Sequence, residues 1–409
     1  MKRLLGVALG VLTAIGGFVD IGDMVTNALV GARFGLSLAW ATILGVLGIC
    51  LYAEMSGRVA AVSGRPTFDL VRERLGPRAG LANLVASSLV TLLTFTAEIG
   101  GVALAFELAT SVNYLLWVPL AGLAVWLVIW RVRFTVLENL FGLLGLALVV
   151  FGVAVWKLGP DWAGLLHQIV RPAKPAEEDW PTYFYYAVGL FGAAMTPYEV
   201  FFFSSGGIEE RWTEKDLGTA RANVFLGFPL GGLLSLAIAA AAMLVLMPHS
   251  IEVSTLGQVA LPVAVAVGKI GVAVALLGFV AATFGAALET GLSCGYAVSQ
   301  YFGWQWGKYV RPREAARFHL LVLLATITSV AVVLTTVDPI TVTEYSVVFS
   351  AVALPLTYFP ILVVANDPDY MGERVNGRLT NTLGTVFLGI VAIAAVAAIP
   401  LMLVTKAGQ

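Results

Sequence analysis

Charge is scarce in this sequence. Only 12% of its 409 residues are Asp, Glu, Lys or Arg, about half the share found in an ordinary soluble domain. Hydrophobic residues make up 59%, and this imbalance excludes a soluble enzyme. Basic residues have no excess either, because 24 Lys and Arg stand against 25 Asp and Glu and give a net charge of −1. Nucleic-acid binding is therefore excluded, since it requires positive charge to neutralise the phosphate backbone.

Residues that commonly bind metals or form disulfides are also few. Cys50 and Cys294 lie inside apolar runs, without a CxxC spacing or a neighbouring histidine. They indicate neither a disulfide framework nor a thiolate metal site, and we expect both to be core residues. The three histidines, His167, His249 and His319, fall in loops or at span ends. The HExxH pair that a membrane metalloprotease would need does not occur.

Long apolar runs are abundant. A bilayer core about 30 Å thick requires about 20 apolar residues of helix, and runs of that length predict an all-α integral membrane protein with eleven transmembrane helices. Residues 1–409 then form one membrane domain, in contact with the lipid bilayer, that acts in transport, conduction or membrane-embedded catalysis. No cofactor and no obligate protein partner is indicated. The predicted helices lie near residues 5–31, 34–57, 81–110, 114–130, 135–157, 182–208, 219–247, 268–299, 316–336, 342–365 and 379–404.

The orientation follows from the distribution of positive charge. We read the first run as a retained helix rather than a signal peptide, because Asp20 and Asp23 interrupt it. With the N-terminus in the cytoplasm of a cell (inner) membrane, the C-terminus lies outside and few basic residues face outward. The longest outer loop, residues 159–181, is expected to be a solvated cap. The basic residues predicted outside are Arg33, Lys157, Arg171, Lys174, Lys269 and Lys406.

Two acids in the first predicted helix suggest a cation site. Asp20 and Asp23, three residues apart, share a helix face at about 5–6 Å and would repel each other without a cation. Gly22 lies between them, and glycine allows carbonyl groups to turn out of a helix. The alternative is that the two acids line a water-filled vestibule or pair with a lone cation elsewhere.

The sixth predicted helix is interrupted in a similar way. Pro197 has no amide hydrogen, so the carbonyl of Ala193 loses its helical partner, and Thr196 adds a hydroxyl beside it. A proline kink alone is commonly silent. Here, however, both interrupted helices are the first of five, which predicts an inverted repeat with a midplane site. The first repeat covers residues 5–157, the second covers 182–365, and an additional helix covers 379–404.

Four stretches resemble one known family. Residues 32–65 (ARFGLSLAWATILGVLGICLYAEMSGRVAAVSGR), 95–108 (FTAEIGGVALAFEL), 284–304 (FGAALETGLSCGYAVSQYFGW) and 381–389 (NTLGTVFLG) are similar to the second, third, eighth and eleventh helices of the NRAMP divalent-metal transporters. The resemblance implies the leucine-transporter-type fold, with five plus five inverted helices, broken helices 1 and 6, and an eleventh helix outside this core.

The ion-binding motifs of the family match in place but not in residue type. Its manganese and iron carriers have Asp-Pro-Gly-Asn where this chain has Asp20-Ile21-Gly22-Asp23. They have Ala-x-x-Met-Pro-His where this chain has Ala193 to Tyr198, so the methionine ligand becomes Thr196 and the histidine becomes Tyr198. Met195 is one residue out of register, about 100° around a helix, and is not expected to replace the lost sulfur.

These replacements favour a hard ion, because thioether ligands suit transition metals whereas oxygen ligands suit Mg²⁺. The pattern resembles the NRAMP-related magnesium transporters, in which the methionine is absent. The resemblance implies import of Mg²⁺, with Mn²⁺ as a second substrate, by alternating access. Metal ligands would be Asp20, Asp23, Ala193 and Thr196, with Gly22, Glu98, Tyr198, Glu199 and Asn223 behind them or along the aqueous path.

Proton coupling is not expected. Proton-driven members use a histidine in helix 6 and acids in helix 3; here these positions hold Tyr198 and Phe95, and only Glu98 remains. Two alternatives stay open. One is a proton-coupled Mn²⁺ or Fe²⁺ carrier, which Cd²⁺ competition would reveal. The other is a sodium-coupled organic-solute transporter of the same fold, which two acids at the break disfavour.

Overall fold

The computed structural model describes residues 18–132 and 134–408, and every regular element in these ranges is helical. The first half contains α2 (Ile21–Phe34), α3 (Ala39–Ser63), α4 (Thr67–Leu75), α5 (Pro77–Thr110), α6 (Tyr114–Arg131), α7 (Phe134–Gly145), η1 (Leu146–Val149), α8 (Val150–Leu158) and α9 (Trp162–Val170). The second half contains α10 (Trp180–Ala194), α11 (Pro197–Glu209), η2 (Glu214–Asp216), α12 (Leu217–Ala222), η3 (Asn223–Gly227), α13 (Phe228–Val245), η4 (Met247–His249), α14 (Leu256–Val267), α15 (Lys269–Phe302), α16 (Ala316–Leu334), α17 (Pro339–Val364), α18 (Pro368–Met371), η5 (Gly372–Arg374) and α19 (Arg378–Val404).

Ten helical segments in the described residues are long and apolar enough to cross a membrane. They correspond one to one to the second through eleventh predicted spans, so the all-α membrane fold is confirmed. Of the first predicted span, the part up to residue 17 lies outside the described residues, and the remainder contains the beginning of α2. Apolar run length located these spans well because the bilayer imposes the same minimum length on each of them.

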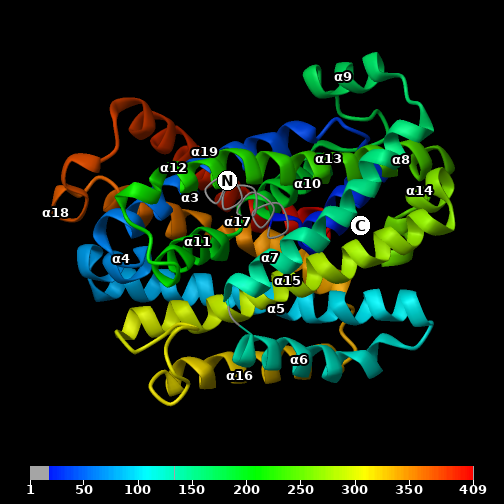
Figure 1. Cartoon of the computed structure of the whole chain (residues 1–409). Helices are drawn as coiled ribbons and strands as arrows, with labels where there is room; N and C mark the ends of the chain where they lie inside the picture. The colour runs from blue at the N-terminus through cyan, green and yellow to red at the C-terminus, as the bar shows by residue number, and fades with distance from the viewer. Residues whose placement is uncertain (1–17, 133, 409) are drawn as a thin grey trace.

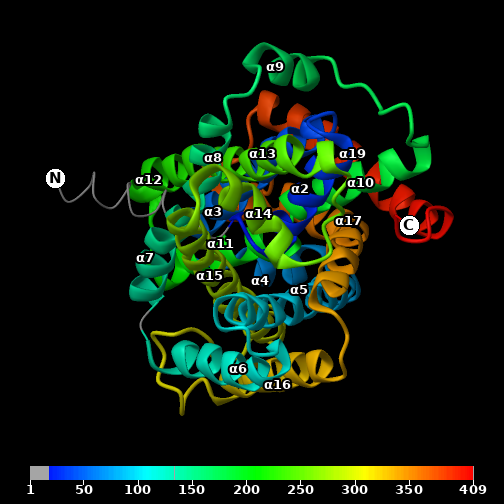
Figure 2. The same cartoon turned by 90° about the vertical axis from the view of Figure 1, so that its right-hand side faces the viewer.

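The centre of the molecule is built on α5 and α15, each 34 residues long, which pack along one another (Figure 1). The α10–α11 segment is the most enclosed, with 89% of its most apolar window buried, against 22% in α19. A peripheral α19 agrees with the expected eleventh helix outside the core. Helices α6 and α16 lie side by side along one edge in both views (Figures 1 and 2).

Four short helices, α4, α9, α14 and α18, were not predicted, because they are amphipathic or too short to stand out by hydropathy. Helices α4 and α18 lie at one end of the molecule, and α9 projects from the other (Figure 1). The α9 helix corrects the expectation of a merely solvated loop over residues 159–181. Asp161 caps it by accepting from the amide of Ala163, and the Gln168 side chain accepts from the amide of Leu36 at 3.1 Å, which ties α9 to the end of α2.

Candidate metal site

The first predicted break is present. Val19 and Asp20 are not helical, and α2 begins directly after them. Asp20 is the N-cap of α2, and its Oδ1 accepts from the amide of Asp23 at 2.8 Å. Gly22 is required for this arrangement, because a Cβ at this position would lie 2.9 Å from Oδ1 of Asp20. Asp20 is thus fixed at a helix N-terminus, where the backbone favours a negative charge.

Glu98 of α5 completes this end of α2. One of its carboxylate oxygens accepts from the amide of Ile21 at 3.1 Å, which satisfies a second N–H group that the helix itself cannot pair. Its other oxygen, Oε2, has no hydrogen-bond partner among the described residues, and the side chain is fully buried. Glu98 therefore lies at the N-terminus of α2, in the same cavity lining as Asp20.

The second predicted break separates α10 from α11 at Met195 and Thr196. Because Pro197 has no amide hydrogen, the carbonyl of Ala193 cannot form its usual helical bond. The hydroxyl of Thr196 donates to Oε2 of Glu199 at 3.3 Å in the first turn of α11. Both breaks thus combine a buried helix end, whose backbone groups lack helical partners, with an oxygen-bearing side chain.

Met195 does not direct its sulfur toward this break. Its side chain packs against Gly48 of α3, where an added Cβ would lie 2.5 Å from the sulfur. Its carbonyl accepts from the hydroxyl of Tyr358 at 3.2 Å, which fixes the backbone at this point. The thioether therefore belongs to the α3–α10 packing interface.

The two breaks meet at one small cavity of about 10 Å³. Its lining includes the predicted residues Asp20, Gly22, Glu98 and Thr196. Among the described residues, this lining has no sulfur, no imidazole and no cationic side chain. The remaining lining residues, which were not predicted, are Ile21, Thr94, Ala97, Thr343, Ser346, Val347 and Ser350. A period of three to four in 343–350 is the sequence signal that could have identified the α17 face.

The other predicted residues are buried outside this lining. Asp23 lies one turn into α2, where Nδ2 of Asn27 donates to its Oδ1 at 3.3 Å and its Oδ2 has no partner among the described residues. Ala193 and Tyr198 flank the second break. Asn223 begins a π-helical turn, Asn223–Gly227, and its Oδ1 has no hydrogen-bond partner within residues 18–132 and 134–408. Such turns are frequent at functional sites.

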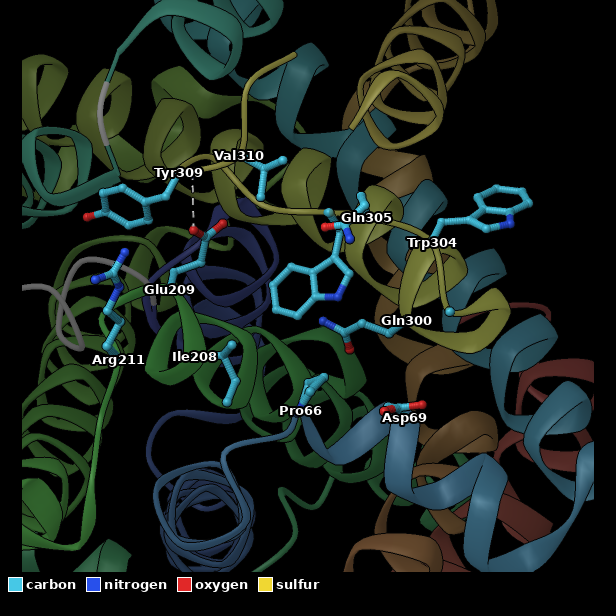
Figure 3. A pocket seen from close by; sticks show the side chains of 12 residues that line it. Pro66, Asp69, Ile208, Glu209, Arg211, Gln300, Trp304, Gln305, Tyr309 and Val310 are labelled. Carbon is cyan, nitrogen blue, oxygen red and sulfur yellow. Dashed lines mark hydrogen bonds between the residues drawn. The ribbon is translucent and has the colours of Figure 1, made fainter. Parts of the chain in front are cut away.

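A larger cavity of about 420 Å³ lies where α11 and α15 end (Figure 3). Glu209 and Asp69 lie on opposite sides of it, and both carboxylates already have partners. Glu209 accepts from the amide of Lys308 at 2.5 Å and from the hydroxyl of Tyr296 at 3.1 Å. Asp69 accepts from Arg65 at 2.8 Å. The small cavity at the breaks is therefore the better candidate for a cation.

The described residues contain no group of three or more His, Cys, Asp and Glu side chains placed to hold a metal. A metal in the small cavity would consequently depend on hydroxyl, carbonyl or water oxygens beside the carboxylates. This donor set is typical of hard cations.

Comparison with protein families identifies the chain. The family model for natural resistance-associated macrophage protein-like proteins (Nramp) matches residues 10–401. The chain belongs to the NRAMP family of divalent-metal transporters. Among curated NRAMP-related proteins, it is 25% identical over 396 residues to the divalent metal cation transporter MntH of Erwinia tasmaniensis, a match that covers 92% of this chain and 89% of that protein. The expectation of a membrane transporter rather than an enzyme is confirmed.

Solved structures show the same fold. A manganese transporter of Eremococcus coleocola, in complex with an aromatic bis-isothiourea compound, superimposes with a TM-score of 0.70 at 19% identity, covering 96% of this chain and 85% of that one. The transporter MhsT in complex with L-phenylalanine gives a TM-score of 0.55 at 17% identity, with 97% of each chain covered. These likenesses confirm the leucine-transporter-type architecture expected for an NRAMP protein.

Proposed function

We propose that this NRAMP-family protein imports Mg²⁺, with Mn²⁺ as a second substrate, through a midplane site between the two helix breaks. The observation that carries the proposal is the cavity at these breaks, whose polar lining consists of oxygen atoms while the sulfur of Met195 packs against Gly48. Oxygen donors favour a hard ion over a soft transition metal.

The proposed ligands are Asp20, Asp23, Thr196 and the carbonyl of Ala193. Two carboxylates would balance the charge of one divalent ion, and Mg²⁺ keeps several of its waters when it binds. Asp20 and Thr196 line the cavity. Asp23, one helical turn further into α2, would then act through a water molecule. Glu98, Glu199, Tyr198 and Asn223 would surround these ligands or line the aqueous path.

Transport would proceed by alternating access, with one bundle rocking against the other around the fixed site. We assign the bundles to two inverted repeats, residues 5–157 and 182–365, with 379–404 as an additional helix. The protein would lie in the cell (inner) membrane with its N-terminus in the cytoplasm and its C-terminus outside. This orientation rests on the asymmetry of Lys and Arg in the loops.

We further propose that transport is not coupled to protons. Tyr198 and Phe95 occupy the positions where proton-driven members of the family have a histidine and an acid. Both side chains are buried, and neither carries the imidazole or carboxylate that a proton relay would use. An inside-negative potential would supply about 4.6 kcal/mol per 100 mV to a divalent ion, twice the value for a single charge. Acidification of the vesicle lumen during uptake would contradict this proposal.

The test is uptake into proteoliposomes of Mg²⁺, Mn²⁺ and Cd²⁺ by the native protein, Asp20→Asn and Asp23→Asn. Asparagine remains a good N-cap, so Asp20→Asn removes the charge while keeping the helix end. Asp338→Asn is the matched control, because Asp338 caps α17 in the same way without lining the cavity.

We expect Mg²⁺ uptake by the native protein, weak Cd²⁺ competition, at least tenfold weaker uptake by the two site variants, and native uptake by the control. A native protein that carries Mn²⁺ and Cd²⁺ but ignores Mg²⁺ would instead be a transition-metal carrier. The Erwinia tasmaniensis relative is named a divalent metal cation transporter, which is compatible with either substrate. A proton-coupled transition-metal carrier would also acidify the vesicle lumen during uptake.

A further inference from the structure

A third wall of the small cavity comes from α17, and the family motifs at the two breaks do not include it. Thr343, Ser346 and Ser350 recur at spacings of three and four residues, which places their hydroxyls on one helical face. All three line the cavity together with Asp20 and Glu98. The cavity is therefore lined by hydroxyl groups of α17 as well as by the side chains at the two helix breaks.

Two of these hydroxyls already have partners. The hydroxyl of Thr343 donates to the carbonyl of Pro339 at 2.8 Å, and Ser346 shares a hydrogen bond of 2.8 Å with Thr94. Ser350 is different. Its side chain is 1% exposed, and its Oγ has no hydrogen-bond partner among the described residues. A buried hydroxyl without a partner costs free energy, so a ligand is its natural explanation.

Within the described part of the chain, Glu98 also has a buried oxygen without a hydrogen-bond partner in this cavity. One of its oxygens accepts from Ile21, whereas Oε2 has no partner among the described residues. Two oxygens that are unpartnered in the part of the chain that the structure describes thus line the small cavity together with the carboxylate of Asp20.

We propose that Ser350 and Glu98 together bind a water molecule that the transported ion keeps in its coordination shell. A metal-bound water directs its lone pair at the ion and has two hydrogens to donate. Oγ of Ser350 and Oε2 of Glu98 are acceptors for these two hydrogens. Ser350 then determines specificity among divalent ions. Its hydrogen bond stabilises an ion that keeps its bound water, and Mg²⁺ loses its waters reluctantly. This inference rests on the proposed site.

The experiment measures Kd by isothermal titration for Mg²⁺ and Mn²⁺ on the purified native protein, Ser350→Ala and Ser299→Ala. Ser299 is the matched control, because it is also fully buried with an unpartnered Oγ but does not line the cavity. Thermal unfolding of each variant is followed in parallel. Competition by hexaamminecobalt(III), whose ammonia ligands do not exchange, probes recognition through the shell.

We expect Ser350→Ala to weaken Mg²⁺ binding about tenfold, the effect of losing one charge-assisted hydrogen bond. In Ser350→Ala, the affinity for Mn²⁺ should fall less than the affinity for Mg²⁺. Competition by hexaamminecobalt(III) should weaken as much as Mg²⁺ binding does. Ser299→Ala should bind like the native protein. Unchanged Mg²⁺ binding in Ser350→Ala would overturn the inference, and so would equal losses for both metals together with a lowered melting temperature.

The magnesium assignment can be wrong while the inference of a bound water at Ser350 is right. If the native protein binds and carries Mn²⁺ but not Mg²⁺, the magnesium assignment is wrong, and the comparison between Ser350→Ala and Ser299→Ala is made with Mn²⁺. A tenfold loss confined to Ser350→Ala, without a change in melting temperature, would then still support the bound water. Native Mn²⁺ affinity in Ser350→Ala would overturn it.

Discussion

Gly22 offers a direct test of how the first break holds Asp20. In Gly22→Ala, the new Cβ would lie 2.9 Å from Oδ1 of Asp20 and 3.2 Å from Cγ1 of Val347, whereas ordinary contacts begin at 3.4 Å. The carboxylate must therefore move by about 0.5 Å, the difference between 2.9 and 3.4 Å. This shift disturbs the 2.8 Å bond from the amide of Asp23, because hydrogen bonds weaken steeply with poorer geometry.

Two free-energy changes then oppose each other. A weakened N-cap lowers the free energy of unfolding by about 1 kcal/mol. Alanine in place of glycine within a helix raises it by about 0.5–1 kcal/mol. The free energy of unfolding should consequently change little. The metal site is affected more, because displacing a carboxylate ligand removes favourable charge interaction that nothing replaces. We expect metal affinity to fall at least tenfold, which corresponds to about 1.4 kcal/mol.

The assay combines isothermal titration with thermal unfolding in detergent. The matched control is Gly152→Ala, since Gly152 lies in α8 with nothing within 4 Å of the added Cβ. This control should be stabilised by about 0.5–1 kcal/mol and should bind metal normally. If Gly22→Ala bound metal as tightly as the native protein, the reasoning that Gly22 positions Asp20 for the ion would be refuted.

Two further predictions concern the missing sulfur and a partly buried lysine. Thr196→Met should make Cd²⁺ a strong competitor of uptake, because it adds a soft ligand. Met195→Leu, a nearly volume-conserving change, should leave Cd²⁺ competition unchanged. Similar Cd²⁺ competition in both variants would contradict the assigned side-chain directions. Burial lowers the pKa of Lys308, between α15 and α16, from 10.5 to about 8, although Glu209 opposes the shift. Between these values the unfolded chain binds more protons, so stability should rise with pH. Melting temperatures at several pH values should show a smaller rise for Lys308→Gln, and an identical slope would argue against a buried amine.

The sequence by itself determined the architecture, because the bilayer leaves few choices. Apolar runs of about 20 residues can only be helices in a membrane, and α19 (Arg378–Val404) begins within one residue of its prediction at 379. The two breaks were also predictable, since Gly22 and Pro197 act on their own backbone. The short helices α9 and α14 were missed because their apolar stretches are too short to span a membrane, and their stability depends on packing against neighbouring helices and on caps such as Thr255.

Only the tertiary structure decided which side chains share the cavity. Asp20 and Asp23 look equivalent in the sequence, yet Asp20 caps α2 and lines the cavity while Asp23 lies outside the lining. Ser350 lies far along the chain from both breaks, and its hydroxyl resembles many others in apolar helices. Its place beside Glu98 follows from how α17 packs against α5. Such contacts join residues hundreds of positions apart, and local sequence patterns carry no information about them.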